Sequence, residues 1–536
     1  NDPRPPETYP LSLPDALPIF GKRVLLLSIR LDDIAYMSCN PAIGGTAKGI
    51  LVREIDALGG LMGKVTDSTG IHFKILNSSR GAAVQSPRAQ ADKRRYSGEM
   101  KLRLEQTPNI FLRQDTAAGL DVSFIENPEP GGPAKRVNGV VTAQGFLYRA
   151  PAVIVCSGTF MKGLIHIGPR TQTGGRAGES SSETLSDSLR AAGLRIERFK
   201  TGTPPRLIGR TIDFSRMEPQ PPDSKPRPFS HFTDETAFAP RQRNCFQSWT
   251  NPAVHSLVQS NLYRAPLYDG AIQSTGPRYC PSFEIKIVRF ADKTKHAVVA
   301  EPEGLDCEEY YLNGFSTSLP ADIQIAAVRL IPGLEATEIS RFGYAIEYDY
   351  APSEQIQRTY ETRAVQGLYL AGQINGTSGY EEAAAQGLLA GVNAALKLDG
   401  RAPFVLGRDE AYAGVMTDDL VTRDIQEPYR LFTSRSEYRL SLRMDNALVR
   451  LGRKAAEIGL LTADDETRAN EILRARDSAL DALKTLRRDG MSLFDRMKRT
   501  GENDSSVWDW VFATAGTEPA LYPSGIDNAL REHLLI

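Results

Sequence analysis

The sequence predicts an α/β protein in which a Rossmann-like nucleotide-binding core is interrupted by an insertion and followed by a helical C-terminal region. Three observations predict this organisation. Residues 367–395 combine a short apolar strand, a glycine turn and a long small-residue helix. Residues 24–28 and 153–160 are apolar runs typical of strands buried on both faces. Residues 216–245 are proline-rich and polar, as expected of an insertion that lies over a surface.

Composition limits the classes of function. The chain has 536 residues, enough for three or four structural units, and its 64 basic and 65 acidic side chains nearly cancel. A nucleic-acid partner must therefore be met by a local basic patch. The five cysteines form no CxxC pair and the six histidines show no metal-ligand spacing, which argues against a disulfide framework or a metal site and fits a reducing cytosol. No apolar run approaches the roughly 20 residues of a membrane span, and no signal peptide is evident, so we expect a soluble cytoplasmic protein.

Residues 1–20 contain six prolines, which remove backbone donors and fix φ. We expect this stretch to be a non-native or disordered start, with regular structure beginning at Lys22. The first strand is then residues 24–28.

A cysteine and two glycines stand just ahead of the next predicted helix. Cys39 and Asn40 precede Gly44 and Gly45, and the helix is expected to start near Thr46. The apolar face of this helix comprises Leu51, Ile55, Leu58 and Met62. The glycines form a candidate anion cradle, and a cysteine at a helix end can become a nucleophile. The alternative is a buried structural cysteine.

Residues 71–96 predict a strand followed by a basic helix start, suited to a solvated face or to phosphates. Residues 110–116 predict another strand. Residues 136–152 alternate as a hairpin that leads into the buried strand at 153–160. This order is typical of the core of flavoproteins with two dinucleotide-binding domains.

The segment 276–290, GPRYCPSFEIKIVRF, places Cys280 in an Arg-Tyr-Cys-Pro turn beside fixed positive charge. That setting favours a thiolate. Two such thiols, Cys39 and Cys280, strengthen the hypothesis of a catalytic role.

The glycine turn at 372–379 brings backbone N–H groups and a positive helix end toward a ligand, with Gln373 and Asn375 adding side-chain amides. It suits a phosphate, a carboxylate or the electron-rich edge of a reduced flavin. A plain strand-to-helix connection is the alternative.

Beyond residue 400 the chain becomes helical and more basic. Residues 427–454 interleave cations with aromatic side chains, a pattern that suits RNA but equally suits a helix whose arginines are salt-bridged inside the protein. Thr462 to Asp465 predicts a capping box that opens a helix with an apolar face made by Ile472, Leu473, Leu480, Leu483 and Leu486.

Several runs in this order resemble the MnmG (GidA) family, the flavin subunit of a tRNA wobble-uridine modification enzyme. They span residues 24–450 and include SCNPAIGG, GGRAG, KTGTPPR, GPRYCPS, EPEGL, STSLP, GYAIEYD, AGQINGT and GYEEAAAQGLLAG. A related family, the folate- and FAD-dependent tRNA uridine methyltransferases, shares the fold but has a different flavin turn. A non-catalytic tRNA-binding or partner-binding remnant is a third possibility.

The resemblance implies a two-dinucleotide-binding-domain flavoprotein that uses FAD, NADH and methylene-tetrahydrofolate. It implies a homodimer that works with the GTPase MnmE on tRNA, and a thiolate of Cys39 or Cys280 that attacks the uridine. The implied domains are a start at 1–20, an FAD core at 21–200 and 351–400, an inserted NAD or substrate domain at 201–350, and a helical domain at 401–536.

The implied ligand contacts fall into two sets. The expected RNA contacts are Arg435, Tyr438 and Arg439. The expected cofactor contacts are Asn40, Gly44, Gly45, Thr116, Ser182, Gly276, Pro277, Arg278, Tyr279, Pro281, Ser282, Glu284, Lys286, Arg289, Phe290, Gly372, Gln373, Ile374, Asn375 and Gly376.

The sequence departs from the family pattern at both ends. The family begins with a strand and a GxGxxG turn that grips the FAD pyrophosphate, and here residues 1–20 stand in its place. The C-terminal helical module is expected to be cut short at Ile536. Ile285 stands where the family more often has an acidic residue.

Overall fold

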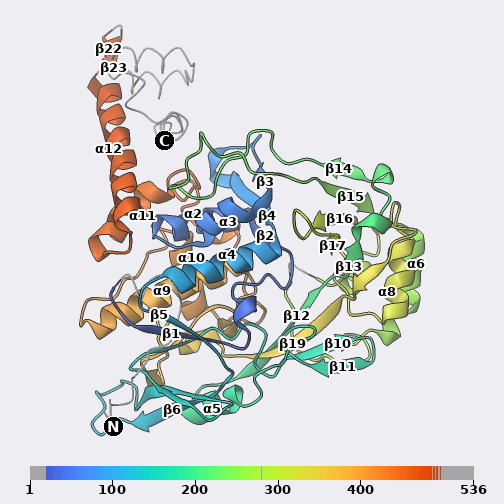
Figure 1. Ribbon diagram of the computed structural model, residues 1–536, viewed down its shortest axis with the longest axis horizontal. Helices are drawn as coiled ribbons and strands as arrows, with labels where there is room; N and C mark the ends of the chain where they lie inside the picture. The colour runs from blue at the N-terminus through green and yellow to red at the C-terminus, as the bar shows by residue number, and fades with distance from the viewer. Residues whose placement is uncertain (1–19, 279–280, 486, 489, 493–494, 496–536) are drawn as a thin grey trace.

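Two lobes with separate hydrophobic cores lie side by side, and a long helix projects from the larger one (Figure 1). The computed structural model describes residues 20–278, 281–485, 487–488, 490–492 and 495. The predictions for residues 1–19, for the thiol loop at 279–280 and for the end of the chain beyond 495 lie outside these residues. Within the described part, the predicted mixture of strands and helices is confirmed.

Short parallel strand pairs form the centre of the larger lobe. Strand β1 (Val24–Ser28) pairs with β5 (Ile110–Gln114), and β9 (Val153–Val155) pairs with β21 (Leu368–Leu370). These strands were predicted, but β9 is shorter than expected because the chain turns at Gly158, where φ is +56°. Helix α9 (Tyr380–Leu398) follows β21 and is buried along most of its length, which confirms the predicted strand, turn and helix. Its many alanines permit this close packing.

The single helix predicted around residues 46–62 is wrong. The structure has two helices, α2 (Lys48–Ala57) and α3 (Met62–Thr69). The chain breaks at Gly59, whose φ of +86° suits glycine, and a Cβ there would lie 2.6 Å from the carbonyl oxygen of Leu460. Helix α2 is also buried on every side, so it has no solvent face.

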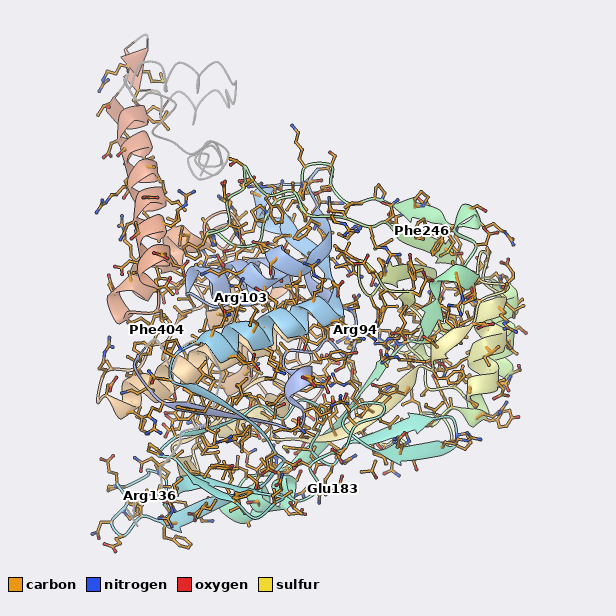
Figure 2. All side chains as sticks on the ribbon, in the orientation of Figure 1. Arg94, Arg103, Arg136, Glu183, Phe246 and Phe404 are labelled. Atoms are coloured by element: carbon orange, nitrogen blue, oxygen red, sulfur yellow. The ribbon has the colours of Figure 1, made fainter. Side chains whose placement is uncertain are left out.

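An antiparallel sheet covers these helices in the order β2 (Ala42–Gly44), β4 (Ser86–Ala91) and β3 (Gly70–Leu76). Helix α4 (Lys93–Gln106) follows it. Arg88, predicted at a basic helix start, instead lies on β4 and binds Glu301 at 3.0 Å. Arg94 and Arg103 lie on α4, with Arg94 nearer to the smaller lobe (Figure 2).

The predicted hairpin at 136–152 is confirmed. Strand β7 pairs antiparallel with β8 and with an additional strand, β6, and α5 packs against β6. Their bounds are β6 (Ala117–Phe124), β7 (Lys135–Thr142), β8 (Leu147–Arg149), β20 (Val365–Gln366) and α5 (Leu185–Ala192).

A second antiparallel sheet carries the chain into and out of the insertion. Strand β12 (Glu197–Thr203) pairs with β19 (Tyr344–Tyr350) along its whole length. Strands β10 (Leu164–Ile167) and β11 (Arg170–Thr173) complete the sheet. Segments about 150 residues apart in the sequence are thus adjacent in the structure.

The insertion forms the smaller lobe, which contains Phe246 (Figure 2). Its six-stranded sheet has the order β14, β15, β16, β17, β13, β18, with α6, α7 and α8 packed into the same core. Their bounds are β13 (Arg206–Ile208), β14 (Glu218–Gln220), β15 (Cys245–Trp249), β16 (Ala297–Pro302), β17 (Glu309–Asn313), β18 (Ile339–Arg341), α6 (Pro252–Ser260), α7 (Phe283–Arg289) and α8 (Ala321–Arg329).

Residues 221–244, here called the strap, return from the insertion across the larger lobe. The backbone N–H of Ile75 donates to Asp223, and the side chain of Phe229 is fully buried among Met37, Ile43 and Phe73. The proline-rich stretch was expected to lie over a surface, and the structure shows that it also contributes to a core.

The C-terminal part, as far as the structure describes it, has three α-helices: α10 (Tyr412–Thr422), α11 (Ala447–Ile458) and α12 (Ala463–Thr485). The capping prediction is confirmed, because the hydroxyl of Thr462 accepts from the Asp465 backbone N–H at 3.2 Å. Leu473 and Leu483 are buried as predicted, and Leu486 lies outside the described residues. The remaining elements are β22 (Arg487–Arg488), β23 (Met491–Ser492) and the 3-10 turns η1 (Leu31–Asp33), η2 (Ala82–Val84), η3 (Gly209–Thr211), η4 (Phe214–Arg216), η5 (Leu262–Arg264), η6 (Ser353–Gln355), η7 (Gly372–Asn375) and η8 (Thr433–Arg435).

Candidate functional site

Cys39 lies where the two lobes meet, and its thiol is half-buried. Its Sγ is 3.0 Å from the Tyr311 hydroxyl of β17 and 3.8 Å from the carbonyl oxygen of Gly202 on β12. Its backbone N–H donates to the hydroxyl of Tyr380, the first residue of α9, at 2.8 Å. Three elements far apart in the sequence therefore fix this cysteine. Because the thiol is only half-buried and lies among polar groups, the alternative of a buried structural cysteine does not hold.

A buried guanidinium supports the same segment. Arg206, at the start of β13, donates to the carbonyl oxygen of Ser38 at 2.7 Å and to the Thr203 hydroxyl at 2.7 Å. Burial is the largest influence and opposes its charge, but Glu303 acting together with Tyr311, Cys39 and Tyr344 more than offsets burial and raises the pKa of Arg206. A permanent cation next to a thiol is the setting in which nucleophilic cysteines occur.

Glu303 joins this guanidinium to the larger lobe. Its carboxylate accepts from Arg206 at 3.0 Å and from Lys93 of α4 at 2.9 Å, and all three side chains are almost fully buried. Burial would raise the pKa of Glu303, but the two cations lower it below its ordinary value. Removing one member would leave an uncompensated buried charge, so the network fixes the lobes around Cys39.

Arg176, in the GGRAG run, approaches the cysteine segment from another side. Its guanidinium donates to the Ser38 hydroxyl at 3.1 Å, pairs with Glu179 at 2.6 Å and lies 4.2 Å from the centre of the Tyr36 ring. The roles of Arg176, Arg206, Tyr311 and Tyr380 were not predicted from the sequence. For the two arginines, the sequence did contain a signal: Arg176 lies in the glycine-rich run GGRAG, and Arg206 lies in the proline-containing run KTGTPPR.

The predicted glycine turn lies at the carboxyl ends of the paired strands β9 and β21. Gly376 has φ of +75°, and a Cβ there would meet the Phe199 ring at 3.0 Å, so the turn requires glycine. Ile374 and Asn375 are buried and Gln373 is half-buried. Among the described residues, the buried Asn375 Oδ1 and Ser157 Oγ atoms have no hydrogen-bond partner. Ligands of open α/β sheets bind at this edge.

The second predicted anion cradle is filled by the protein itself. The Gly44 backbone N–H donates to Glu381 at 2.7 Å, and Lys48 pairs with Glu381 at 2.7 Å and with Glu382 at 3.1 Å. The expectation of a ligand anion at Gly44 is therefore corrected, because a carboxylate of α9 takes that place. Gly45 faces open space and Asn40 Oδ1 has no partner among the residues described.

The segment that precedes Cys280 runs beside β12. The Lys200 backbone N–H donates to the carbonyl oxygen of Thr275 at 3.0 Å, and a Cβ on Gly276 would lie 2.5 Å from the Lys200 side chain. Pro277 is buried and Arg278 is exposed. The same strand, at Gly202, contacts the Cys39 thiol. Tyr279 and Cys280 themselves lie outside the described residues.

The remaining expected cofactor contacts of the segment 276–290 are divided between the interior and the surface. Glu284 is fully buried and accepts from Thr317 and Ser318, while Lys286 donates to the carbonyl oxygen of Gly314 at 2.7 Å. These two side chains stabilise the smaller lobe, which differs from the predicted cofactor contact. Pro281 is half-buried, Ser282 is buried, and Arg289 and Phe290 are exposed at the end of α7.

Thr116 and Ser182 lie close together, as expected of residues that share a site. The Ser182 hydroxyl donates at 2.7 Å to the carbonyl oxygen of Ala117, the neighbour of Thr116. Ser182 is buried and Thr116 is half-buried.

The three predicted RNA contacts do not behave alike. Arg435 donates to the carbonyl oxygen of Arg430 at 2.9 Å, pairs with Asp419 at 3.4 Å and lies over the Tyr429 ring at 4.5 Å. It is thus used inside the protein, which corrects the prediction of an exposed phosphate contact. Tyr438 and Arg439 are exposed.

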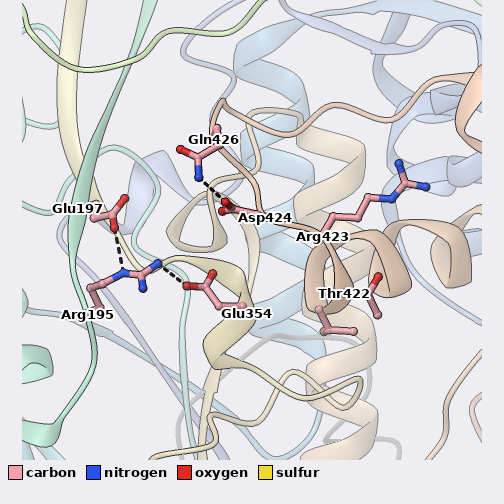
Figure 3. Close-up of a pocket in the computed structure, with 8 residues that line it drawn as sticks. Arg195, Glu197, Glu354, Thr422, Arg423, Asp424 and Gln426 are labelled. Carbon is pink, nitrogen blue, oxygen red and sulfur yellow. Dashed lines mark hydrogen bonds and ion pairs between the residues drawn. The ribbon is translucent and has the colours of Figure 1, made fainter.

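An open polar groove lies elsewhere, between the start of β12 and the end of α10 (Figure 3). Arg195 bridges Glu197 and Glu354 across it, and Gln426 donates to Asp424. None of the predicted site residues lines this groove, so we assign no role to it.

Two further features, a membrane-spanning helix and a metal cluster, are absent from the described residues. No helix in this part is both long and apolar enough to cross a membrane. No cluster of three or more His, Cys, Asp or Glu side chains suited to a metal ion occurs in the same residues.

Comparison with known proteins identifies the family. Residues 16–402 match the family described as glucose inhibited division protein A. The chain is 54% identical over 447 residues to "tRNA uridine 5-carboxymethylaminomethyl modification enzyme MnmG" of Thermodesulfovibrio yellowstonii, covering 83% of this chain and 69% of that protein. The protein of the same name from Geobacter sulfurreducens is 54% identical over 466 residues, covering 87% and 72%.

A solved structure agrees. "Structure of Aquifex aeolicus GidA in the form I crystal" superposes with a TM-score of 0.86 at 45% identity, covering 97% of this chain and 84% of that one. By sequence and by fold, the chain belongs to the glucose inhibited division protein A family.

Proposed function

We propose that this chain is a tRNA-modifying enzyme that adds an aminomethyl or carboxymethylaminomethyl group to carbon 5 of the wobble uridine. The proposal includes FAD, NADH and methylene-tetrahydrofolate as cofactors, a homodimer, the GTPase MnmE as partner, and the cytoplasm as location. The names of the relatives support the tRNA uridine reaction. The observation that carries it in this chain is the Cys39 thiol, held 3.0 Å from Tyr311 beside the buried Arg206.

The residues present fit a flavin. The two buried polar atoms Asn375 Oδ1 and Ser157 Oγ lie just beyond the carboxyl ends of β21 and β9, and they lack partners within the described chain. We propose that Gly372, Gln373, Asn375 and Gly376 hold the isoalloxazine ring, with Thr116 and Ser182 on the remainder of the cofactor. FAD, when bound, supplies electron transfer between NADH and the one-carbon unit.

The proposed role of Cys39 is covalent. Its thiolate forms an S–C6 bond with the uridine, which makes carbon 5 nucleophilic. Carbon 5 and the nitrogen of ammonium or glycine then each bond to the methylene carbon, while the two bonds from that carbon to folate nitrogens break and tetrahydrofolate leaves. After carbon 5 loses its proton, the S–C6 bond breaks and the thiolate leaves. Tyr311 is placed to exchange a proton with the sulfur, and Arg206 supplies a fixed positive charge next to it. Cys280 is the alternative nucleophile.

The test is tRNA modification by the purified chain with FAD, NADH, methylene-tetrahydrofolate, ammonium or glycine, and MnmE supplied with GTP, read by mass spectrometry of the nucleosides. We expect yellow, flavin-loaded protein and a carbon-5 product. Cys39→Ser and Cys280→Ser should each lose roughly 100-fold or more of the activity while the fold is retained. Cys307→Ser, a half-buried cysteine of the smaller lobe, is the matched control and should stay active.

Three outcomes contradict the proposal. Full activity of Cys39→Ser removes this thiol from the mechanism. Salt-dependent tRNA binding without flavin makes the chain a non-catalytic binder. A 5-methyluridine product places it with the folate-dependent methyltransferases.

A further inference from the structure

The smaller lobe presents a patch of cations and aromatic rings, of which only Arg289 and Phe290 belong to the expected cofactor contacts. This insertion patch consists of Trp249, Arg289, Phe290, Lys293 and Lys295. The two rings are each 39% exposed, which is high for such large apolar side chains, and the three cations are exposed.

The members are contiguous. The Lys295 ammonium lies 4.5 Å from the centre of the Trp249 ring, and the Lys293 ammonium lies 5.5 Å from that of Phe290. Strand pairing sets Trp249 opposite Ala297, at the end of the same turn, and the His296 ring lies 6.5 Å from Phe290. The two aromatic surfaces and the cations thus belong to one turn, residues 288–297, and the strand beside it.

The patch is locally basic in a chain that is nearly neutral. Residues 288–297 hold three permanent cations and one acid, Asp292, whereas the formal net charge of the whole chain is −1. In the described structure no carboxylate lies within ion-pair distance of Arg289, Lys293 or Lys295. These charges remain available to a polyanion, and only a local patch can attract one in so balanced a protein.

We propose that the insertion patch binds unpaired nucleotides of the tRNA substrate, with the cations on phosphates and with Trp249 and Phe290 stacked on bases. The inference rests on the proposed function. Phosphate neutralisation supplies affinity that depends on salt, and stacking supplies affinity that does not depend on the base. Tryptophan, phenylalanine and arginine are also enriched at protein interfaces, but lysine is depleted there, so the two lysines of the patch favour a polyanion over a protein partner.

The experiment measures tRNA binding by the flavin-loaded full chain over a range of salt concentrations. Lys293→Ala/Lys295→Ala should weaken binding roughly tenfold and make the slope of log K against log salt shallower by about 2. Trp249→Ala should weaken binding by roughly tenfold with an unchanged slope. The matched control is Arg216→Ala, an exposed arginine of the same lobe that pairs with Glu335 at 2.7 Å, and it should bind like the parent.

The results separate the two proposals. If the parent binds and modifies tRNA while the patch variants keep its affinity and slope, the patch inference falls and the proposed function stands. If the parent binds no tRNA, the proposed function fails and the inference with it. If the variants bind tRNA normally but no longer bind MnmE, the patch is a protein-docking surface and the RNA assignment is overturned.

Discussion

Two stretches of this chain combine cations with aromatic rings, and the structure treats them in opposite ways. In the region 427–454, Arg435 pairs with Asp419 and lies over the Tyr429 ring. Arg408 and Arg423, which precede this region, pair with the same carboxylate. In the insertion patch the cations have no such partner in the described structure. Composition alone does not separate an internal scaffold from an open surface. The two stretches differ because of Asp419, a fully buried carboxylate on α10 that forms ion pairs with three arginines.

The largest expected effect comes from removing that carboxylate. Asp419 also accepts from the Tyr429 hydroxyl at 3.1 Å, so Asp419→Ala leaves a buried hydroxyl and several guanidinium groups without their partner. We expect a loss of about 3–5 kcal/mol in the free energy of unfolding, measured by chemical denaturation. Asp306→Ala is the control, because Asp306 and Arg241 are both largely exposed and their charged groups are 3.8 Å apart. Equal stability of the two variants would contradict the distinction.

Next in size is the contrast between one cation from each stretch. Arg435→Ala should cost about 1–3 kcal/mol of stability, because it removes a backbone hydrogen bond and a ring contact, and tRNA affinity should change little. Lys295→Ala should do the reverse, with a stability change within about 0.5 kcal/mol and weaker binding. Thermal unfolding and filter binding on both variants test this pair. Strong loss of tRNA affinity in a stably folded Arg435→Ala would restore Arg435 as an RNA contact.

In the parent, the smallest expected effect is that of pH, because the pH dependences of two buried groups oppose each other: His231 in the strap and Asp67 on α3. Burial, together with Arg53, lowers the pKa of His231 from 6.5 to about 4, so its contribution to stability falls as pH falls across that window. Burial raises the pKa of Asp67 from 3.8 to about 7, despite bonds from Thr233 and two backbone N–H groups, so its contribution falls as pH rises through that window. In the parent, the contributions of His231 and Asp67 to the free energy of unfolding therefore change with pH in opposite directions.

Substitution of either residue should leave the pH dependence of stability that the other residue causes. Relative to the parent, His231→Gln should lose stability as pH rises from about 4 to 7, and Asp67→Asn should gain stability as pH rises from about 4 to 6.5, each by on the order of 3 kcal/mol. Urea denaturation at several pH values measures this. The double variant should return to a nearly flat profile, and parallel profiles for all four proteins would show that neither group titrates as described.

Much of the fold was predictable, because apolar runs and glycine turns report local structure. The strand, turn and helix around β21 and α9, the hairpin at β7 and β8, and the cap at Thr462 were predicted and are confirmed. The break between α2 and α3 was not predicted. Residue 59 must be glycine because its backbone approaches the carbonyl oxygen of Leu460, which lies about 400 residues later in the chain. Periodicity does not report such a contact.

The site was predictable in part for the same reason. Cys39 was predicted from its motif, but the partners that hold it lie at residues 206, 311 and 380 and meet only through tertiary structure. The sequence also favoured the cradle at Gly44 for a ligand without revealing that Glu381 would reach it. A glycine-rich turn in the sequence indicates where an anion can bind. Only the fold shows whether that anion is a ligand or, as at Gly44, a carboxylate of the protein itself.

The burial of Phe229 has a consequence for synthesis of the protein. Its ring completes the core formed by Met37, Ile43 and Phe73, so residues early in the chain need a side chain from the middle of it. On the ribosome, the first hundred residues cannot finish packing until the strap emerges, and their apolar surface stays open to chaperones and to aggregation for that interval.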